Sequence, residues 1–127
     1  MCFLRRGVCR TGLYHFSTLA LFMAKQSEGR IVDAIIKFLR TLPRSFVYKV
    51  HGGRFQRAGL PDIYFTCDRL DGRSFWFEVK TSTGRLTRLQ EQTIEDLDRA
   101  GCVVAVVRSV DDVRVAIANA YGGRFDH

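Results

Sequence analysis

Apolar residues recur at helical spacing in the segment that follows Ser27. The stripe consists of Ile31, Val32, Ile35, Ile36 and Leu39. Positions three and four apart share one helix face, so this spacing predicts a helix from an N-cap at Ser27 to about Arg40. Leu42-Pro43 ends it. Glu28 falls on the inward face of the same stripe.

Short runs of β-branched and aromatic residues follow, each bounded by turn residues. They predict strands at Phe46–Val50, Ile63–Cys67 and Phe75–Val79. Asp71-Gly72 favours a tight reversal between the last two strands, which predicts a β-hairpin. A glycine-rich loop over residues 51–59 leads from the first strand toward the hairpin.

A second helical signal begins at Thr87. Gln90 stands three residues later, as in a capping box, and Ala100-Gly101 ends the helix. Its modest inward stripe comprises Leu89, Gln92, Thr93, Ile94 and Leu97.

The last strand and helix complete the order of elements. Cys102–Val107 is continuously apolar, as expected of a central strand covered on both faces. Ser109 is the predicted cap of a final helix over Val110–Ala120. The order of helix, three strands, helix, strand and helix predicts the α/β class, with a mixed sheet flanked by helices.

The two ends of the chain do not share this pattern. Residues 1–22 have basic residues and a diluted apolar run that matches neither a secretory signal nor a membrane span. Met23-Ala24-Lys25 looks like a natural start, so we expect residues 1–22 to be a misassigned start or a leader. The predicted domain covers residues 23–120, and residues 121–127 are expected to form a mobile tail.

Charge and cysteine usage narrow the possible partners. The net charge of +7 permits a polyanionic partner, but four of the basic residues lie in positions 1–25 without any acid, so a nucleic-acid surface must be a local patch. The cysteines lack metal-site spacing, and Cys67 and Cys102 are expected to be small buried hydrophobes. A reducing cytoplasm (a host's, if the chain is viral) is the expected location, without a membrane or a nucleotide cofactor.

Charged side chains converge at one end of the predicted hairpin. Asp62 opens the first strand, opposite the end of the second, where Glu78 and Lys80 project to the same face. Clustered carboxylates beside apolar strands require a compensating cation, and their oxygens suit Mg²⁺ or Mn²⁺. Lys80 would lie beside the metal. Glu28 has two readings of equal weight: a first-turn acid that stabilises the helix dipole, or a third carboxylate at the site.

These residues form a recognisable motif. Pro61-Asp62 and Glu78-Val79-Lys80 resemble the PD-(D/E)XK nuclease motif. With Gly59-Leu60 before it and Gly84-Arg85-Leu86-Thr87 and Gln90 after it, the string resembles the virus-type replication-repair nuclease (VRR-NUC) domain over roughly residues 28–112.

The resemblance implies a restriction-endonuclease-like fold for residues 23–120. It further implies metal ligands from Asp62, Glu78, the Val79 carbonyl and Glu28, and a Gln90 that points into the site. The capping box is the alternative role for Gln90, and the sequence leaves that choice open.

We therefore expect a DNA endonuclease with bound Mg²⁺ or Mn²⁺, in which Lys80 orients the attacking water or neutralises charge on the phosphate. The candidate phosphate contacts are Arg54, Arg57, Arg85 and Arg88. Stand-alone members of the resembled family imply a homodimer that resolves Holliday junctions. The alternatives are a flap or splayed-DNA nuclease, a nuclease subunit of a replication-repair assembly, a non-catalytic DNA-binding module and a small-molecule metallohydrolase. The last lacks the His-rich ligand set usual for such sites.

Overall fold

The computed structural model describes residues 26–122, and its elements follow the predicted order. The elements are α2 (Glu28–Arg40), β1 (Ser45–Lys49), β2 (Ile63–Cys67), the 3-10 turn η1 (Asp68–Leu70), β3 (Phe75–Val79), α3 (Arg88–Arg99), β4 (Val103–Val107) and α4 (Val110–Ala120). The predicted α/β class, with a mixed sheet flanked by helices, is confirmed.

The four strands form one sheet in the order β1-β2-β3-β4, in which β1, β2 and β3 are antiparallel and β4 runs parallel to β3. The prediction of a central last strand is wrong, because β4 forms an edge of the sheet. Helices α4 and α3 contact β4 from opposite faces of the sheet, but they cover it incompletely. Val107 is buried, Val106 is exposed, and the other three β4 residues are half-buried.

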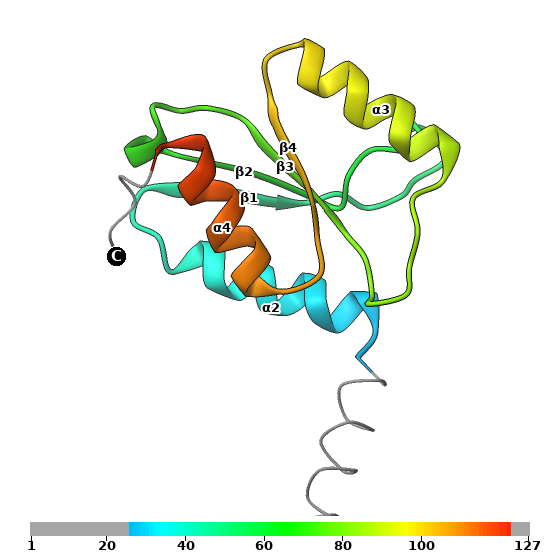
Figure 1. The fold of residues 1–127 in the computed structure, drawn as a ribbon, viewed down its shortest axis with the longest axis horizontal. Helices are drawn as coiled ribbons and strands as arrows, with labels where there is room; N and C mark the ends of the chain where they lie inside the picture. The colour runs from blue at the N-terminus through cyan, green and yellow to red at the C-terminus, as the bar shows by residue number, and fades with distance from the viewer. Residues whose placement is uncertain (1–25, 123–127) are drawn as a thin grey trace, which may run out of the picture.

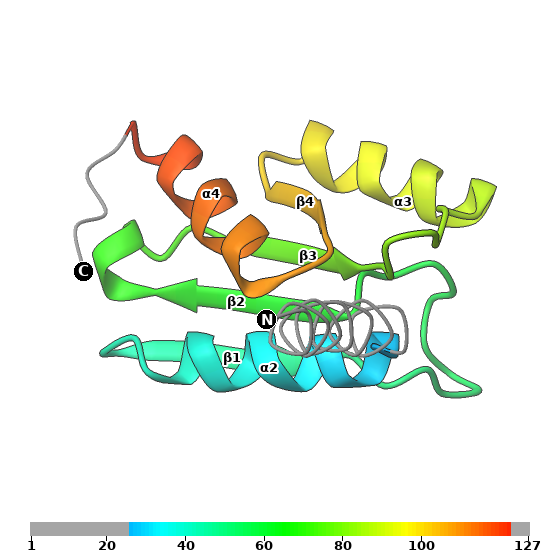
Figure 2. The same cartoon turned by 60° about the horizontal axis from the view of Figure 1, so that its bottom comes forward.

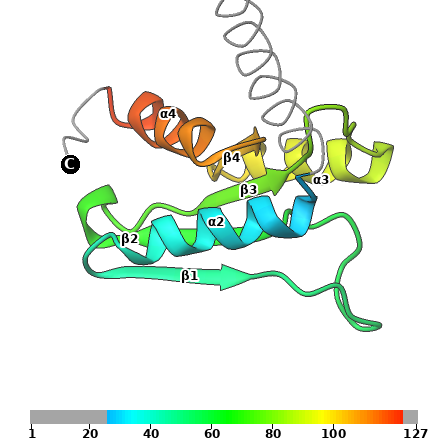
Figure 3. The same ribbon diagram turned by 90° about the horizontal axis from the view of Figure 1, so that it is seen from below.

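Helices lie on both faces of the sheet. In Figure 1, α2 and α4 lie on one side of the strands and α3 lies on the other. Figure 2 shows α2 beside β1 and α4 nearer β3 and β4, and Figure 3 shows α2 in front of the strands with α3 behind them. The hydrophobic core fills the layer under α2 and α4; its fully buried members include Ile35, Leu39, Ile63, Phe65, Phe75, Phe77, Val79 and Ile117.

The predicted caps begin each of the three helices within residues 26–122. The side chains of Ser27, Thr87 and Ser109 each accept a hydrogen bond from a backbone N–H in the first turn. The prediction for the inward stripe of α3 is only partly correct. Thr93 is buried, but Leu89 is 48% exposed, because α3 packs mainly against β4 at the sheet edge.

The described domain extends past residue 120, its predicted end. The Tyr121 ring stacks on Phe75 with centroids 6.1 Å apart, and its hydroxyl donates to the Leu70 carbonyl. Tyr121 therefore belongs to the domain and not to a tail. The segments 1–22 and 123–127 lie outside the described residues.

Two further sequence expectations concern cysteines and membranes. Cys67 is buried as predicted, whereas Cys102 is half-buried at the sheet edge, and neither forms a disulfide within residues 26–122. Among the helices of that range, none combines the length and apolarity that a membrane crossing requires.

Candidate active site

Asp62 is fixed at the point where the pairing of β2 and β3 ends. The last cross-strand pair is Ile63 with Phe77, so continuing the register places Asp62 opposite Glu78. Asp62 Oδ2 accepts a hydrogen bond of 2.8 Å from the backbone N–H of Val79. The predicted position of Asp62, opposite the end of the second hairpin strand, is confirmed.

Glu78 carries a carboxylate that is almost completely buried. Alternation along β3 sends Phe77 and Val79 into the core and sends Glu78 to the opposite face. Glu78 is 1% exposed, and its Oε1 atom accepts hydrogen bonds from Lys80 Nζ at 2.8 Å and from Gln90 Nε2 at 2.7 Å. Its Oε2 atom is buried and has no hydrogen-bond partner among residues 26–122.

Lys80 links two acids from different elements. Its backbone N–H donates to the Val107 carbonyl at 3.0 Å, which holds the residue beside the end of β4. Its Nζ atom lies 2.8 Å from Glu78 Oε1 and 3.6 Å from Glu28 Oε1. Glu28 is therefore in contact with the site, although its side chain remains half-exposed in the first turn of α2.

The pKa shifts of Glu78 and Lys80 reflect this crowding. Burial raises the pKa of Glu78; the Lys80 hydrogen bond offsets part of the rise, and the charges of Asp62 and Glu28 add to it. Burial alone would lower the pKa of Lys80, but the hydrogen bond to Glu78 and the three nearby carboxylates raise it overall. Lys80 is thus held in its protonated form in this arrangement.

Gln90 fills both of the roles that the sequence left open. Its side-chain oxygen accepts from Thr87 N at 2.9 Å while its backbone N–H donates to Thr87 Oγ1 at 3.2 Å, which completes the capping box. Its Nε2 atom donates to Glu78 at the same time. The N-terminus of α3 therefore orients the buried carboxylate.

The oxygen atoms of Asp62, Glu78 and Glu28 are the candidate ligands for a divalent cation. No three His, Cys, Asp or Glu side chains within residues 26–122 are clustered tightly enough to form a preassembled metal site. Glu78 Oε1 is engaged by Lys80 and Gln90, and Asp62 Oδ2 by Val79 N. The buried Oε2 atom of Glu78 lacks the partner that such an atom requires, and a cation would supply it. The residues fit Mg²⁺ or Mn²⁺ in this respect, while the metal ligands, including the Val79 carbonyl, stay a prediction.

The four arginines predicted to contact DNA are all exposed, but they are not equivalent. Arg57 Nη2 forms a 2.9 Å ion pair with Asp96 on α3, which ties the glycine-rich loop to that helix. Arg54 and Arg57 line an open cavity of about 400 Å³ together with Asp62, so this loop does border the site. Arg85 and Arg88 flank the capping residue of α3.

Arg108 is a positioning residue that the sequence analysis missed. Its guanidinium donates to the carbonyls of Thr81 and Gly84, at 3.1 and 3.2 Å for Gly84, and so fixes the loop that follows Lys80. The parallel pairing of Val79 with Val107 is what places Arg108 next to Lys80. The sequence does not show this register, so it gave no signal for the contact.

Comparisons with known proteins bear on the fold. No protein-family model matches this chain, and no curated protein matches it. A solved structure described as a VRR_NUC domain is similar, with a TM-score of 0.59 and 22% sequence identity over 77% of this chain and 97% of that chain. This similarity confirms the restriction-endonuclease-like architecture, and the chain therefore has the fold of a VRR-NUC domain.

Proposed function

We propose that this protein is a metal-dependent endonuclease that hydrolyses phosphodiester bonds in DNA. The observation that carries the proposal is the buried Glu78 carboxylate, which has one oxygen without a partner and lies among Lys80, Asp62 and Glu28. Carboxylates that only supported the fold would be paired at both oxygens or replaced by apolar groups. A site of this composition is suited to a divalent cation and a phosphate.

The residues that would hold Mg²⁺ or Mn²⁺ are Asp62, Glu78 and the Val79 carbonyl, with Glu28 as a ligand directly or through water. When bound, the metal would lower the pKa of a water ligand to about 7 and stabilise negative charge on the phosphate. The three carboxylates come from α2, the start of β2 and the end of β3, and the sheet holds two of them in register.

Lys80 and Gln90 would assist the reaction without binding the metal. The hydrogen bond to Glu78 and the nearby carboxylates raise the pKa of Lys80, and its ammonium would donate to a phosphate oxygen or to the attacking water. Gln90 holds the Glu78 carboxylate in place from a helix end that the capping box makes rigid.

Arginines would compensate for the repulsion between these acids and the DNA backbone. We assign phosphate contacts to Arg54, Arg85 and Arg88, and to Arg57 as far as its ion pair with Asp96 allows. Because the net positive charge is modest outside residues 1–25, binding should depend on this local group of arginines.

The physiological substrate that we propose is branched DNA, cut by a homodimer. One domain of this size has one site and cuts one strand per encounter, whereas a four-way junction needs two cuts related by two-fold symmetry. The resemblance to stand-alone VRR-NUC proteins points the same way. A flap or splayed-DNA nuclease is the alternative.

Cleavage of a panel of duplex, flap, splayed and four-way-junction DNAs, with Mg²⁺ or Mn²⁺ and with chelator, tests the proposal. We expect paired nicks on the junction that require metal and that disappear in Glu78→Gln. Binding without cleavage under all conditions would identify a DNA-binding module instead. Flaps cut much faster than junctions would identify a flap nuclease.

A further inference from the structure

Strand β4 leaves a row of backbone hydrogen-bonding groups at the edge of the sheet. Val103 N donates to Ser74 at 2.9 Å and the Val107 carbonyl accepts from Lys80 at 3.0 Å, so the backbones of these two residues face β3. Backbone groups alternate sides along a strand, so the N–H and C=O groups of Val104 and Val106 face outward. Nothing between Val103 and Val107 protects this edge, since the run contains neither a charge nor a proline.

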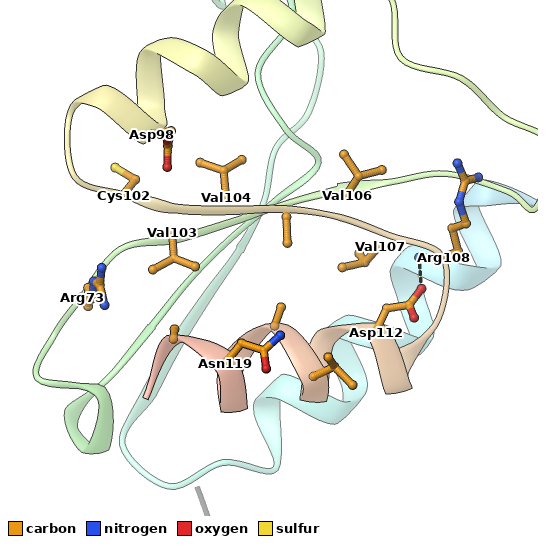
Figure 4. Close-up of a pocket in the computed structure, with 14 residues that line it drawn as sticks. Arg73, Asp98, Cys102, Val103, Val104, Val106, Val107, Arg108, Asp112 and Asn119 are labelled. Atoms are coloured by element: carbon orange, nitrogen blue, oxygen red, sulfur yellow. Dashed lines mark hydrogen bonds between the residues drawn. The ribbon is translucent and has the colours of Figure 1, made fainter. Parts of the chain in front are cut away.

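An open groove follows this edge between β4 and α4. It encloses about 700 Å³ and is lined by all five β4 residues and by one side of α4. Two of its apolar side chains are unusually open for a domain of this size: Val106 is 38% exposed and Val115 on α4 is 56% exposed. Figure 4 shows the valines of β4 spread along the middle of the groove.

The charges at the two ends of the groove are complementary. Arg73 and Asp98 lie at the Cys102 end, and Arg108 and Asp112 lie at the other end (Figure 4). Asp98 and Arg108 extend to the α3 side of the strand, whereas Arg73 and Asp112 lie on the α4 side. Each face of the groove therefore has a cation at one end and an anion at the other.

We infer that a second copy of this chain docks in this groove, with the two β4 strands antiparallel around a two-fold axis at Ala105. The rotation places Val104 opposite Val106 of the second copy, which pairs all the outward backbone groups of these residues. It also brings Asp98 to Arg108 of the second copy and Arg73 to Asp112 of the second copy. The same rotation repeats every contact, so the charges match at both ends.

The interface itself does not depend on the proposed nuclease function, but its consequence for DNA cleavage rests on that function. An axis perpendicular to the sheet keeps both Glu78 side chains on the same face of an eight-stranded sheet. Glu78 is paired with Val106, one residue from the axis and one strand from the edge. Strand spacings then place the two Glu78 Cα atoms on the order of 15 Å apart, a separation suited to paired cuts in one branched DNA.

Sedimentation velocity of the full chain tests the interface without DNA or metal. We expect a dimer at micromolar concentration. Val106→Pro removes one outward N–H and leaves the β3 hydrogen bonds intact, so it should raise the dissociation constant at least about 100-fold. The matched control Val106→Thr keeps the N–H and the β-branched shape and should remain dimeric. A monomeric wild-type chain, or a dimeric Val106→Pro variant, would overturn the interface.

Charge reversal provides a second readout that does not disturb the strand. Arg73→Glu places two acids together at each end of the groove and should weaken dimerisation about tenfold or more. Lys37→Glu makes the same change in charge on the exposed side of α2 and should have no effect on dimer mass. Equal effects of the two variants would contradict the proposal. Loss of the dimer on deletion of residues 1–22 would assign the interface to that segment instead.

Cross-linking tests the register. In a chain with Cys2 and Cys9 replaced by serine, Ala105→Cys should form an intermolecular disulfide, because facing residues lie about 4.5–5.5 Å apart. Cys102 is too far from the axis to link to its own copy, so cross-linking without Ala105→Cys would show a different register. The monomeric Val106→Pro variant should still nick flap DNA. If neither it nor the wild type cuts any DNA, the nuclease proposal fails and the interface stands.

Discussion

On the face of the sheet beneath α2 and α4, each strand contributes side chains that exclude water, whereas the face toward α3 receives aromatic and charged side chains from the same strands. Phe77 and Val79 lie in the first layer, and Glu78 between them points the other way. All three are at most 1% exposed. At these three positions of β3, the two faces therefore differ in chemistry and not in depth.

Because of this difference, the side chains of the first face stabilise the fold, whereas the charged side chains of the second face form the candidate site. Burying Phe77 or Val79 is favourable by itself, while burying Glu78 is costly and depends on Lys80 and Gln90. The exposed aromatics Phe46 and Tyr48 on the open part of the second face contribute little to the core. Truncation of buried apolar residues on the first face should destabilise the protein, and substitution of the charged residues at the second-face site should stop the reaction without unfolding it.

The largest expected effect is on catalysis. Asp62→Ala, Glu78→Ala and Lys80→Ala should each lower metal-dependent cleavage by about 10²–10³-fold or more, because each removes a charge at the reacting phosphate. Thermal melting should show folded proteins, and DNA binding should persist. The control Lys49→Ala removes a lysine whose ammonium forms an ion pair with Asp33 at 3.2 Å, and it should cut normally. Wild-type rates in both Glu78→Ala and Lys80→Ala would refute the assignment.

Phe77→Ala and Trp76→Ala compare the two faces at adjacent positions of β3. Phe77 is fully buried among Phe65 and Phe75, so its truncation should lower the free energy of unfolding by about 3–5 kcal/mol. Trp76 is half-buried and contacts Tyr64 edge to face at 5.0 Å, so its loss should be roughly 1–2 kcal/mol. Urea denaturation measures both. Equal losses would show that the second face also supports the core.

Gly59 lies directly against α3, next to Leu89 and Thr93. Its φ is +83°, and an added Cβ would lie 2.8 Å from Leu89 Cγ and 2.9 Å from the Leu89 carbonyl oxygen. Gly59→Ala should therefore cost about 1–3 kcal/mol in backbone strain, and the displaced α3 should carry Gln90 away from Glu78 and slow cleavage.

Gly52→Ala is the matched control, because an added Cβ there meets no atom within 4 Å. It should change the unfolding free energy by less than about 0.5 kcal/mol. If both variants cleave DNA at the wild-type rate, the position of α3 does not control the site.

The sequence was most informative where one physical rule acts alone. Runs of β-branched and aromatic residues between turn residues predicted the hairpin strands at Ile63–Cys67 and Phe75–Val79, and capping chemistry predicted the starts of the three helices within residues 26–122. The two carboxylates and Lys80 converge as predicted, because strand pairing fixes their relative positions.

The sequence was least informative where the outcome depends on which elements become neighbours. The apolar run of β4 predicts a central strand, but it does not show whether a strand lies on each side or how far the helices cover it. For the same reason the contact of Arg108 with the loop after Lys80 could not be read from spacing alone. Tyr121 follows the last helix like a tail residue, yet its ring fits the space beside Phe75.

The smallest expected effect comes from Tyr121, at the far end of the first face. Tyr121→Phe keeps the stacking on Phe75 but removes the hydrogen bond to the Leu70 carbonyl, so it should cost about 1 kcal/mol near neutral pH. Burial, with the charge of Asp71, raises the pKa of the Tyr121 hydroxyl. Because the folded state favours the protonated hydroxyl, this stability is present below the usual pKa of about 10 and is lost as pH rises through the raised value. The difference between wild type and Tyr121→Phe in urea denaturation should therefore shrink over the interval that begins at about pH 10 and extends upward. A constant difference over that interval would show that the hydroxyl is as free to ionise as in the unfolded chain.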